Sequence, residues 1–175
     1  LYVLRGISLA KMDKDIFGNA TSSDPYLKIT LGKFKFDDRK NAIDDMTDVD
    51  FYKMIEMDCE LPGTSQLKID VMDKYTIGSD DLIGSTTIDL EDRWFDARWQ
   101  QLGFENKRDP GEDPTNPTAC RWYTKPVERR VLYQPSSTMS QGVLETWVDI
   151  MKPEFASTFP PDDVSLPPTQ MFEVR

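Results

Sequence analysis

Apolar residues recur at every second position in several short stretches of the chain. Leu67, Ile69 and Val71 follow this period in one stretch, and the same period recurs in residues 26–31 and 143–150. A period of two places the apolar side chains on one face of an extended backbone, so each stretch predicts a half-buried β-strand. The full set of predicted strands covers residues 1–9, 26–31, 34–40, 51–59, 67–72, 82–89, 121–124 and 142–151.

Eight short strands at fairly regular spacing are typical of an all-β antiparallel sandwich or barrel. The stretch 90–102 departs from this pattern, because its apolar residues recur at nearly helical spacing and predict a short helix. The charged stretch 103–116 that follows predicts a loop. We expect one domain over residues 1–151, with the helix and a charged insertion at 91–119 between the sixth and seventh strands. A proline-rich linker is expected over residues 152–175, leading toward a further domain.

Charge and composition narrow the function. The chain holds 31 acidic and 21 basic residues, which gives a formal net charge of −10, and its sequence has no histidine. An acidic surface repels the phosphate backbone of nucleic acids, so we expect no nucleic-acid partner. A chain without histidine has no Ser-His-Asp or Cys-His catalysis and no histidine-ligated zinc. We therefore expect a binding module rather than an enzyme.

The two cysteines, Cys59 and Cys120, have neither the spacing of a metal site nor that of a redox pair. Unpaired thiols are typical of a reducing compartment. No apolar run approaches the length that spans a bilayer. We expect both thiols to be free, and we expect a soluble segment that faces the cytosol.

Two of the predicted connections, residues 11–24 and 73–81, are rich in aspartate and also hold apolar residues. A single aspartate is common in turns, because its side chain accepts hydrogen bonds from nearby backbone. Clustering in only these two connections favours a metal site, because calcium takes about six to eight oxygen ligands.

Two sequences at the ends of these connections resemble those of C2 domains. Ser23–Ile29 (SDPYLKI) resembles the signature that follows the first calcium-binding loop, and Asp81–Gly84 (DLIG) resembles the one that closes the third loop. The resemblance implies an eight-stranded antiparallel C2 β-sandwich. Because the chain opens with the strand before the first loop and closes on its eighth strand, it resembles the permutation called type II topology.

Further stretches resemble, more narrowly, a C2 domain of the ferlin family. The resemblance covers most of residues 1–95 and 133–151 and is weak over 103–132. It implies a module of a larger membrane-anchored protein in membrane trafficking or vesicle fusion. The ferlin-like stretches are Ser79–Gly84, Ile88–Arg93, Pro135–Ser137 and Gln141–Ile150.

The C2 resemblance implies calcium ligands position by position. Asp15 matches the leading ligand of the first loop, and Asp24 matches its closing ligand. Asp73 and Asp81 match the first and last ligands of the third loop. Calcium is therefore the expected cofactor.

The sequence departs from the family pattern at two places. Tyr75 stands where the family has the middle aspartate of the third loop, and the first loop is extended around residues 19–22. Asp13 and Asp80 are candidates to replace the missing carboxylate. Fewer carboxylates weaken a calcium site, because the charge of the ligands sets its affinity.

The expected function is calcium-gated docking to an anionic phospholipid membrane. Bound calcium would cancel the negative charge of the loops, and apolar loop tips would then enter the bilayer, where burial contributes about 25 cal/mol per Å². The residues placed at the tips are Ile16, Phe17, Tyr75 and Ile77.

Two alternatives stay open. Tyr75 and the long first loop are also consistent with a calcium-independent scaffold that binds other domains of the chain or fusion-machinery proteins. The targeting domain of a lipid-acting enzyme is a further alternative, although the sequence holds no catalytic constellation. Lys28, Lys33 and Lys35 are candidates for headgroup binding on a strand face, beside acidic residues typical of an ordinary solvated surface.

Overall fold

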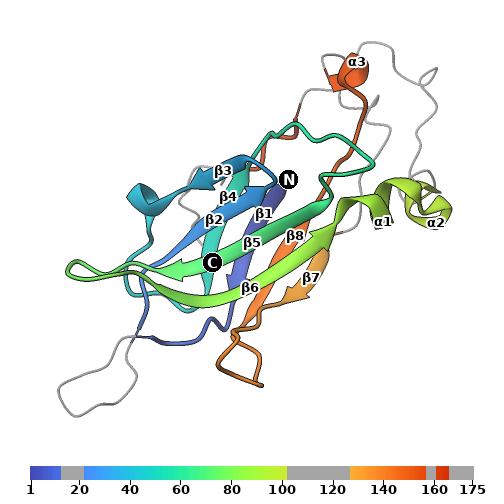
Figure 1. The fold of residues 1–175 in the computed structure, drawn as a ribbon. Coiled ribbons are helices and arrows are strands. Elements are labelled where there is room, and N and C mark those ends of the chain that lie inside the picture. The colour runs from blue at the N-terminus through green and yellow to red at the C-terminus, as the bar shows by residue number, and fades with distance from the viewer. Residues whose placement is uncertain (13–21, 102–126, 157–160, 166–175) are drawn as a thin grey trace, which may run out of the picture.

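The computed structural model describes residues 1–12, 22–101, 127–156 and 161–165. Within these ranges, two four-stranded antiparallel sheets pack on each other as a β-sandwich (Figure 1). One sheet has the order β4-β1-β8-β7 and the other has the order β3-β2-β5-β6. The strands are β1 Tyr2–Ile7, β2 Pro25–Leu31, β3 Phe34–Asp37, β4 Val49–Met54, β5 Gln66–Asp73, β6 Asp81–Asp89, β7 Glu128–Val131 and β8 Val143–Trp147.

The order of the strands agrees with the expected topology. The closing strand β8 lies beside the opening strand β1 and pairs with it antiparallel from Tyr2–Trp147 to Ile7–Val143. The prediction of an eight-stranded antiparallel sandwich with a C-terminal closing strand is therefore confirmed.

The segments with a period of two form the centre of the core. Leu67, Ile69 and Val71 of β5 are at most 1% exposed, as are Leu27 and Ile29 of β2. Leu27 is the cross-strand partner of Val71, and Ile29 is the partner of Ile69, so their side chains share the inner face of the sheet. The pattern therefore identified both the strands and the buried face.

The seventh strand differs from the sequence-based expectation. The strand predicted at 121–124 lies outside the described residues, and the seventh strand of the sandwich is β7. Three of the four residues of β7 are charged, and the strand forms one edge of its sheet. Charged residues are common on edge strands, because one side of the strand stays in water. This composition hides the apolar alternation by which the other strands were identified.

Two short helices, α1 Leu90–Phe95 and α2 Ala97–Gln101, occupy the stretch where the sequence predicts one. The break is at Asp96, whose backbone is extended and whose Oδ1 accepts hydrogen bonds from the backbone N–H groups of Arg98 (2.6 Å) and Trp99 (2.9 Å). Such an aspartate caps the start of a new helix. The charged insertion that follows lies outside the described residues. The remaining short helices are η1 Arg39–Asn41 and α3 Pro153–Ala156, the latter inside the predicted linker.

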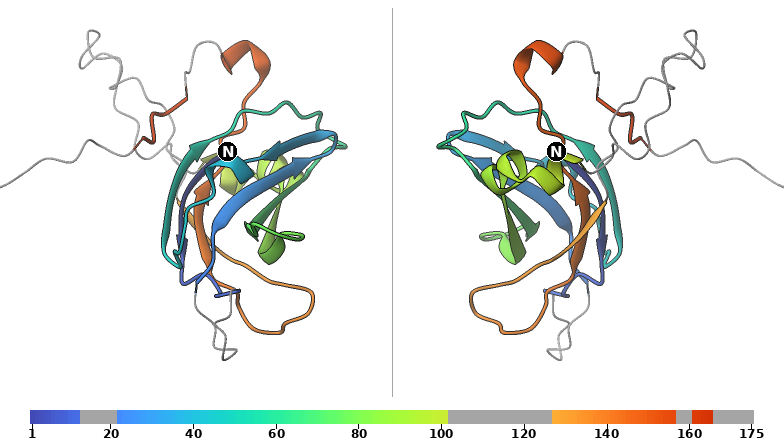
Figure 2. Two further views of the ribbon diagram at one scale, coloured as in Figure 1. Left: turned by 90° about the vertical axis from the view of Figure 1, so that its left-hand side faces the viewer. Right: turned by 90° about the vertical axis from the view of Figure 1, so that its right-hand side faces the viewer.

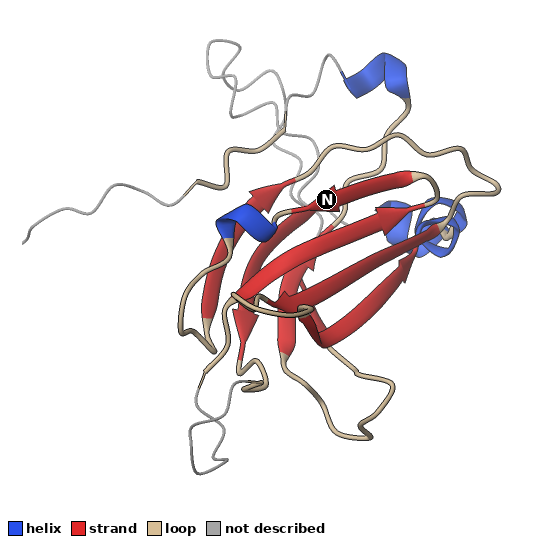
Figure 3. Ribbon diagram, turned by 60° about the vertical axis from the view of Figure 1, so that its left-hand side comes forward, coloured by secondary structure: helices blue, strands red, loops and turns tan. Residues whose placement is uncertain are grey.

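The connections at the two ends of the sandwich differ in character. The first, second and third loops, which follow β1, β3 and β5, emerge together at one end, which we call the loop end. Helices α1 and α2 lie at the opposite end (Figure 3). None of the described helices is long and apolar enough to cross a membrane.

Candidate functional site

Strand register brings three of the predicted ligands together at the loop end. Asp73 ends β5, and its cross-strand partners are Pro25 on one side and Asp81 on the other. Asp24 directly precedes Pro25. Cross-strand partners have Cβ atoms about 5 Å apart, so these aspartates stand on three adjacent segments of chain.

Asp73 is the buried centre of this group. Its side chain is fully buried, and its Oδ1 accepts a hydrogen bond from the backbone N–H of Asp24 at 2.6 Å. The Asp24 carbonyl in turn accepts from the backbone N–H of Lys74 at 3.1 Å. These two bonds join the end of the first loop to the start of the third.

The second loop also reaches this group. The carboxylate of Asp24 accepts from the backbone N–H of Asp45 at 3.0 Å, and the carboxylate of Asp45 accepts from the hydroxyl of Ser22 at 2.6 Å. Asp45 has a positive φ of 56°, which places it in the left-handed region where aspartate and asparagine are tolerated. All three loops therefore converge on the same carboxylates.

The donor chemistry of Asp24, Asp73 and Asp81 suits calcium, because carboxylate oxygens are hard ligands. Among the residues that the structure describes, no group of three or more acidic, cysteine or histidine side chains is close enough to hold a metal ion. Asp13 and Asp15 lie outside the described residues. Within the described residues, Asp24, Asp73 and Asp81 therefore do not form a metal site by themselves, and their role as calcium ligands stays a prediction.

Asp80 is engaged elsewhere. Its carboxylate accepts hydrogen bonds from Arg39 Nε (2.5 Å) and Nη2 (2.9 Å), from the hydroxyl of Tyr26 (2.7 Å) and from the backbone N–H of Tyr75 (3.1 Å). The Arg39 guanidinium holds the pKa of Asp80 far below its usual range. Arg39 also donates to the carbonyl of Tyr75 at 2.8 Å. The structure thus makes Asp80 an anchor for the third loop, and coordination of a metal would require some of these bonds to break.

The tip of the third loop is exposed. Ile77 is 92% exposed, and the space around its neighbour Gly78 is open, since a Cβ added there would meet no atom within 4 Å. Gly78 has a φ of 108°, a conformation that glycine adopts without strain. Tyr75 is half-buried and lies below the tip. The other predicted tip residues, Ile16 and Phe17, lie outside the described residues.

Two of the predicted lysines, Lys28 and Lys35, lie on the outer face of the β3-β2-β5-β6 sheet, whereas Lys33 lies in the turn between β2 and β3. Lys28 forms an ion pair with Asp37 at 3.5 Å and lies 5.4 Å above the ring of Tyr26, whose hydroxyl is the main cause of a raised pKa for Lys28. Lys33 and Lys35 are exposed. Only part of this face therefore carries uncompensated positive charge.

The loop end also has a basic cavity, which the sequence did not predict. It has a volume of about 490 Å³ and is lined by Asp37, Arg39, Lys40 and Lys74. Lys40 belongs to η1, and Lys74 follows β5. The two residues are 34 positions apart in the sequence, so only the tertiary structure shows that they line one cavity.

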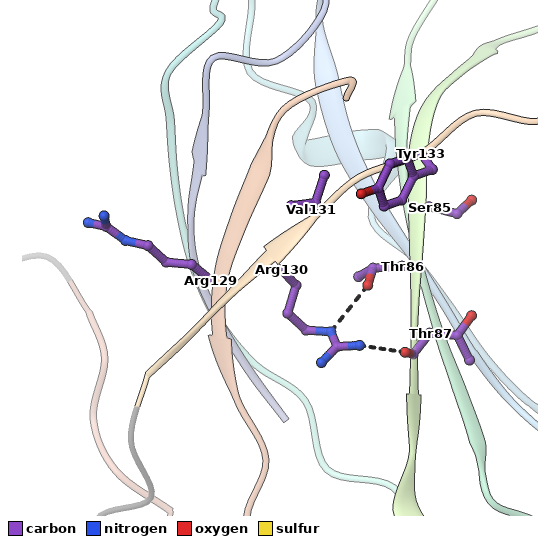
Figure 4. Close-up of a pocket in the computed structure, with 7 residues that line it drawn as sticks. All are labelled: Ser85, Thr86, Thr87, Arg129, Arg130, Val131 and Tyr133. Carbon is purple, nitrogen blue, oxygen red and sulfur yellow. Dashed lines mark hydrogen bonds between the residues drawn. The ribbon is translucent and has the colours of Figure 1, made fainter. Parts of the chain in front are cut away.

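A second cavity, of about 380 Å³, lies between the edges of the two sheets (Figure 4). Arg130 of β7 reaches across it and donates to Thr86 Oγ1 (3.1 Å) and to the carbonyl of Thr87 (2.6 Å) on β6. These bonds close the edge of the sandwich. Tyr133, which also lines the cavity, is 56% exposed.

Comparison with known proteins agrees with these features. A family model of the C2 domain matches residues 1–106. The chain is 32% identical over its full length to Ferlin 2 of Toxoplasma gondii, and 40% identical over 59% of its length to Myoferlin of Mus musculus. It spans 11% and 5% of the lengths of these relatives. A solved structure of two calcium-bound C2 domains of Extended-Synaptotagmin 2 matches with a TM-score of 0.54 and 19% identity, over 82% of this chain and 42% of that one, which supports the fold alone.

Proposed function

Because the chain belongs to the C2 domain family and its curated relatives are ferlins, we propose that it is a calcium-dependent module for binding anionic phospholipid membranes. The observation that carries the proposal is the convergence of Asp24, Asp73 and Asp81 beside the exposed Ile77. We propose further that the module serves a larger ferlin-like protein in membrane trafficking or fusion, at the cytosolic face of a membrane. In this role it binds and does not catalyse.

In this proposal the aspartates of the loop end bind the metal, and its exposed apolar side chain contacts the bilayer. Asp24, Asp73 and Asp81, with Asp15 from the first loop, would hold the metal. Calcium supplies positive charge that offsets these carboxylates and offers coordination positions to lipid phosphate oxygens. Ile77 buries apolar area in the bilayer, and the paired strands behind it keep their hydrogen bonds out of the hydrocarbon.

The net charge of the chain favours attraction to an anionic membrane at one local part of the surface rather than over the whole domain. At a net charge of −10, the domain is repelled by an anionic membrane surface as a whole. Lys40 and Lys74, which line the basic cavity, add local positive charge at the loop end. Approach through the loop end is therefore the orientation that electrostatics favours.

Calcium-dependent sedimentation with anionic liposomes tests the proposal. Asp81→Asn should lower calcium-dependent sedimentation, because it removes one carboxylate from the loop end. Asp58→Asn is the matched control, because it makes the same change in an exposed aspartate at the opposite end. Unchanged sedimentation of the wild-type protein with and without millimolar calcium would refute calcium dependence.

The exposed Tyr133 at the second cavity favours one alternative, a calcium-independent protein-interaction module. In that case the partners would be other domains of the chain or proteins of the fusion machinery. A partner that binds equally well with and without calcium, and that is lost in Tyr133→Ala, would support this function instead.

A further inference from the structure

Two aromatic rings stack on the sheet that contains the opening and closing strands. Tyr2 of β1 and Trp147 of β8 are cross-strand partners, and their ring centroids are 4.1 Å apart with an interplanar angle of 14°. The indole N–H of Trp147 also donates to the carboxylate of Asp149 at 3.3 Å. We call Tyr2 and Trp147 the aromatic platform.

The aromatic platform faces away from the core. Alternate residues of a strand point to opposite faces, and Leu1 and Val3 on either side of Tyr2 belong to the core cluster. Leu144 and Val148 place Trp147 on the outer face by the same argument. Tyr2 and Trp147 are nevertheless only 5% and 9% exposed. Some other part of the chain therefore covers this outer face.

Residues 161–165 make a direct contact there. The backbone N–H of Asp162 donates a hydrogen bond to the hydroxyl of Tyr2 at 2.8 Å, across 160 positions of sequence. Asp162 and Val164 are half-buried, whereas Pro161, Asp163 and Ser165 are exposed. This alternation is typical of an extended segment with one side against a surface. Figure 2 shows the segment outside the sheet of β1 and β8, near the N-terminus.

We propose that the aromatic platform is a docking site for an extended, proline-containing segment, and that its occupant is residues 161–165 of the same chain. Pro161 begins this segment. Proline fixes φ, so such a segment loses little conformational entropy on binding, and aromatic surfaces are the usual partners of extended proline-rich chains.

The aromatic platform lies far from the loop end of the sandwich. Tyr2 begins β1, and the far end of β1 leads into the first loop, so the platform lies at the end of the sandwich opposite the loop end. Residues 161–165 are therefore held away from the loops, and they belong to the folded module rather than to a linker.

Hydrogen exchange of backbone amides, measured by NMR on the whole 175-residue chain, tests the proposal. Tyr2→Phe keeps the ring stack and removes only the hydroxyl that accepts from Asp162. Exchange of the Asp162 amide should become about fivefold faster, which corresponds to the loss of one ordinary hydrogen bond. Tyr133→Phe is the matched control, because it removes a hydroxyl from an exposed tyrosine at an edge of the sandwich, and it should leave this amide unchanged.

A second variant changes the donor of the hydrogen bond instead of its acceptor. Asp162→Pro removes the N–H donor without touching the sandwich, and exchange at Val164 should then rise. Exchange in residues 161–165 that is unaffected by both Tyr2→Phe and Asp162→Pro would overturn the proposal. Sedimentation should show a monomer. A dimer that keeps the protection would assign the aromatic platform to a second copy's segment and would also overturn docking within one chain.

Discussion

Replacing Ile77 with serine tests the membrane contact without disturbing the sandwich. Ile77 is 92% exposed at the tip of the third loop, and the residues on either side of it are exposed as well. Surface substitutions of this kind usually change the stability of the fold by less than about 0.5 kcal/mol. Ile77→Ser should therefore keep the melting temperature and the calcium affinity of the wild-type protein.

The size of the effect on membrane binding follows from the area that the side chain can bury. Moving an exposed isoleucine side chain fully out of water contributes about 1.5–3 kcal/mol. Because about 1.4 kcal/mol is a factor of ten in an equilibrium constant, the partition coefficient to anionic liposomes should fall by about tenfold to a hundredfold. Partial insertion would place the result at the lower end of this range.

The assay is liposome sedimentation at saturating calcium, with melting temperature and calcium titration measured on the same samples. Phe95→Ser is the matched control, because Phe95 is 58% exposed in α1 at the opposite end of the sandwich. If Phe95→Ser weakens lipid binding as much as Ile77→Ser does, the loop end is not the contact surface. A Lys33→Glu/Lys35→Glu variant that is more damaging than Ile77→Ser would instead place the contact on the strand face.

Three further results are expected. Tyr75→Asp should raise calcium affinity by about tenfold, measured by calorimetry, because it adds a carboxylate where the family pattern has one, and an unchanged affinity would place residue 75 outside the metal site. Asp80→Asn should be less stable than wild type in urea by the same margin at pH 7 and pH 5. Because Arg39 lowers the folded-state pKa of Asp80, that margin should shrink only below the unfolded value near 3.9, and a margin that already shrinks between pH 7 and pH 5 would contradict this. Cys59 is free in the structure, so titration of the unfolded, non-reduced protein should find two free thiols, Cys59 and Cys120, and the mass of a single bridge would contradict this.

The sequence by itself determined the sandwich and which of its loops are rich in aspartate. The period of two in β2 and β5 reports burial directly, because consecutive side chains of a strand face opposite sides. Asp24, Asp73 and Asp81 were predicted as calcium ligands from the resemblance to C2 domains, and the structure adds that they lie at the ends of neighbouring strands. The edge strand β7 was missed at Glu128–Val131, because its charged side chains need not alternate with apolar ones.

Only the tertiary structure decided which distant residues meet. Arg39 and Asp80 are 41 positions apart, and Tyr2 and Asp162 are 160 apart, yet each pair forms a hydrogen bond. No local pattern predicts such pairs, because they depend on the order and register of strands in two sheets. The sequence could therefore propose Asp80 as a metal ligand and residues 152–175 as a linker. Both stay predictions, and the tertiary structure adds the ion pair of Asp80 with Arg39 and the hydrogen bond from Asp162 to Tyr2, because folding decides which distant surfaces come within hydrogen-bonding distance.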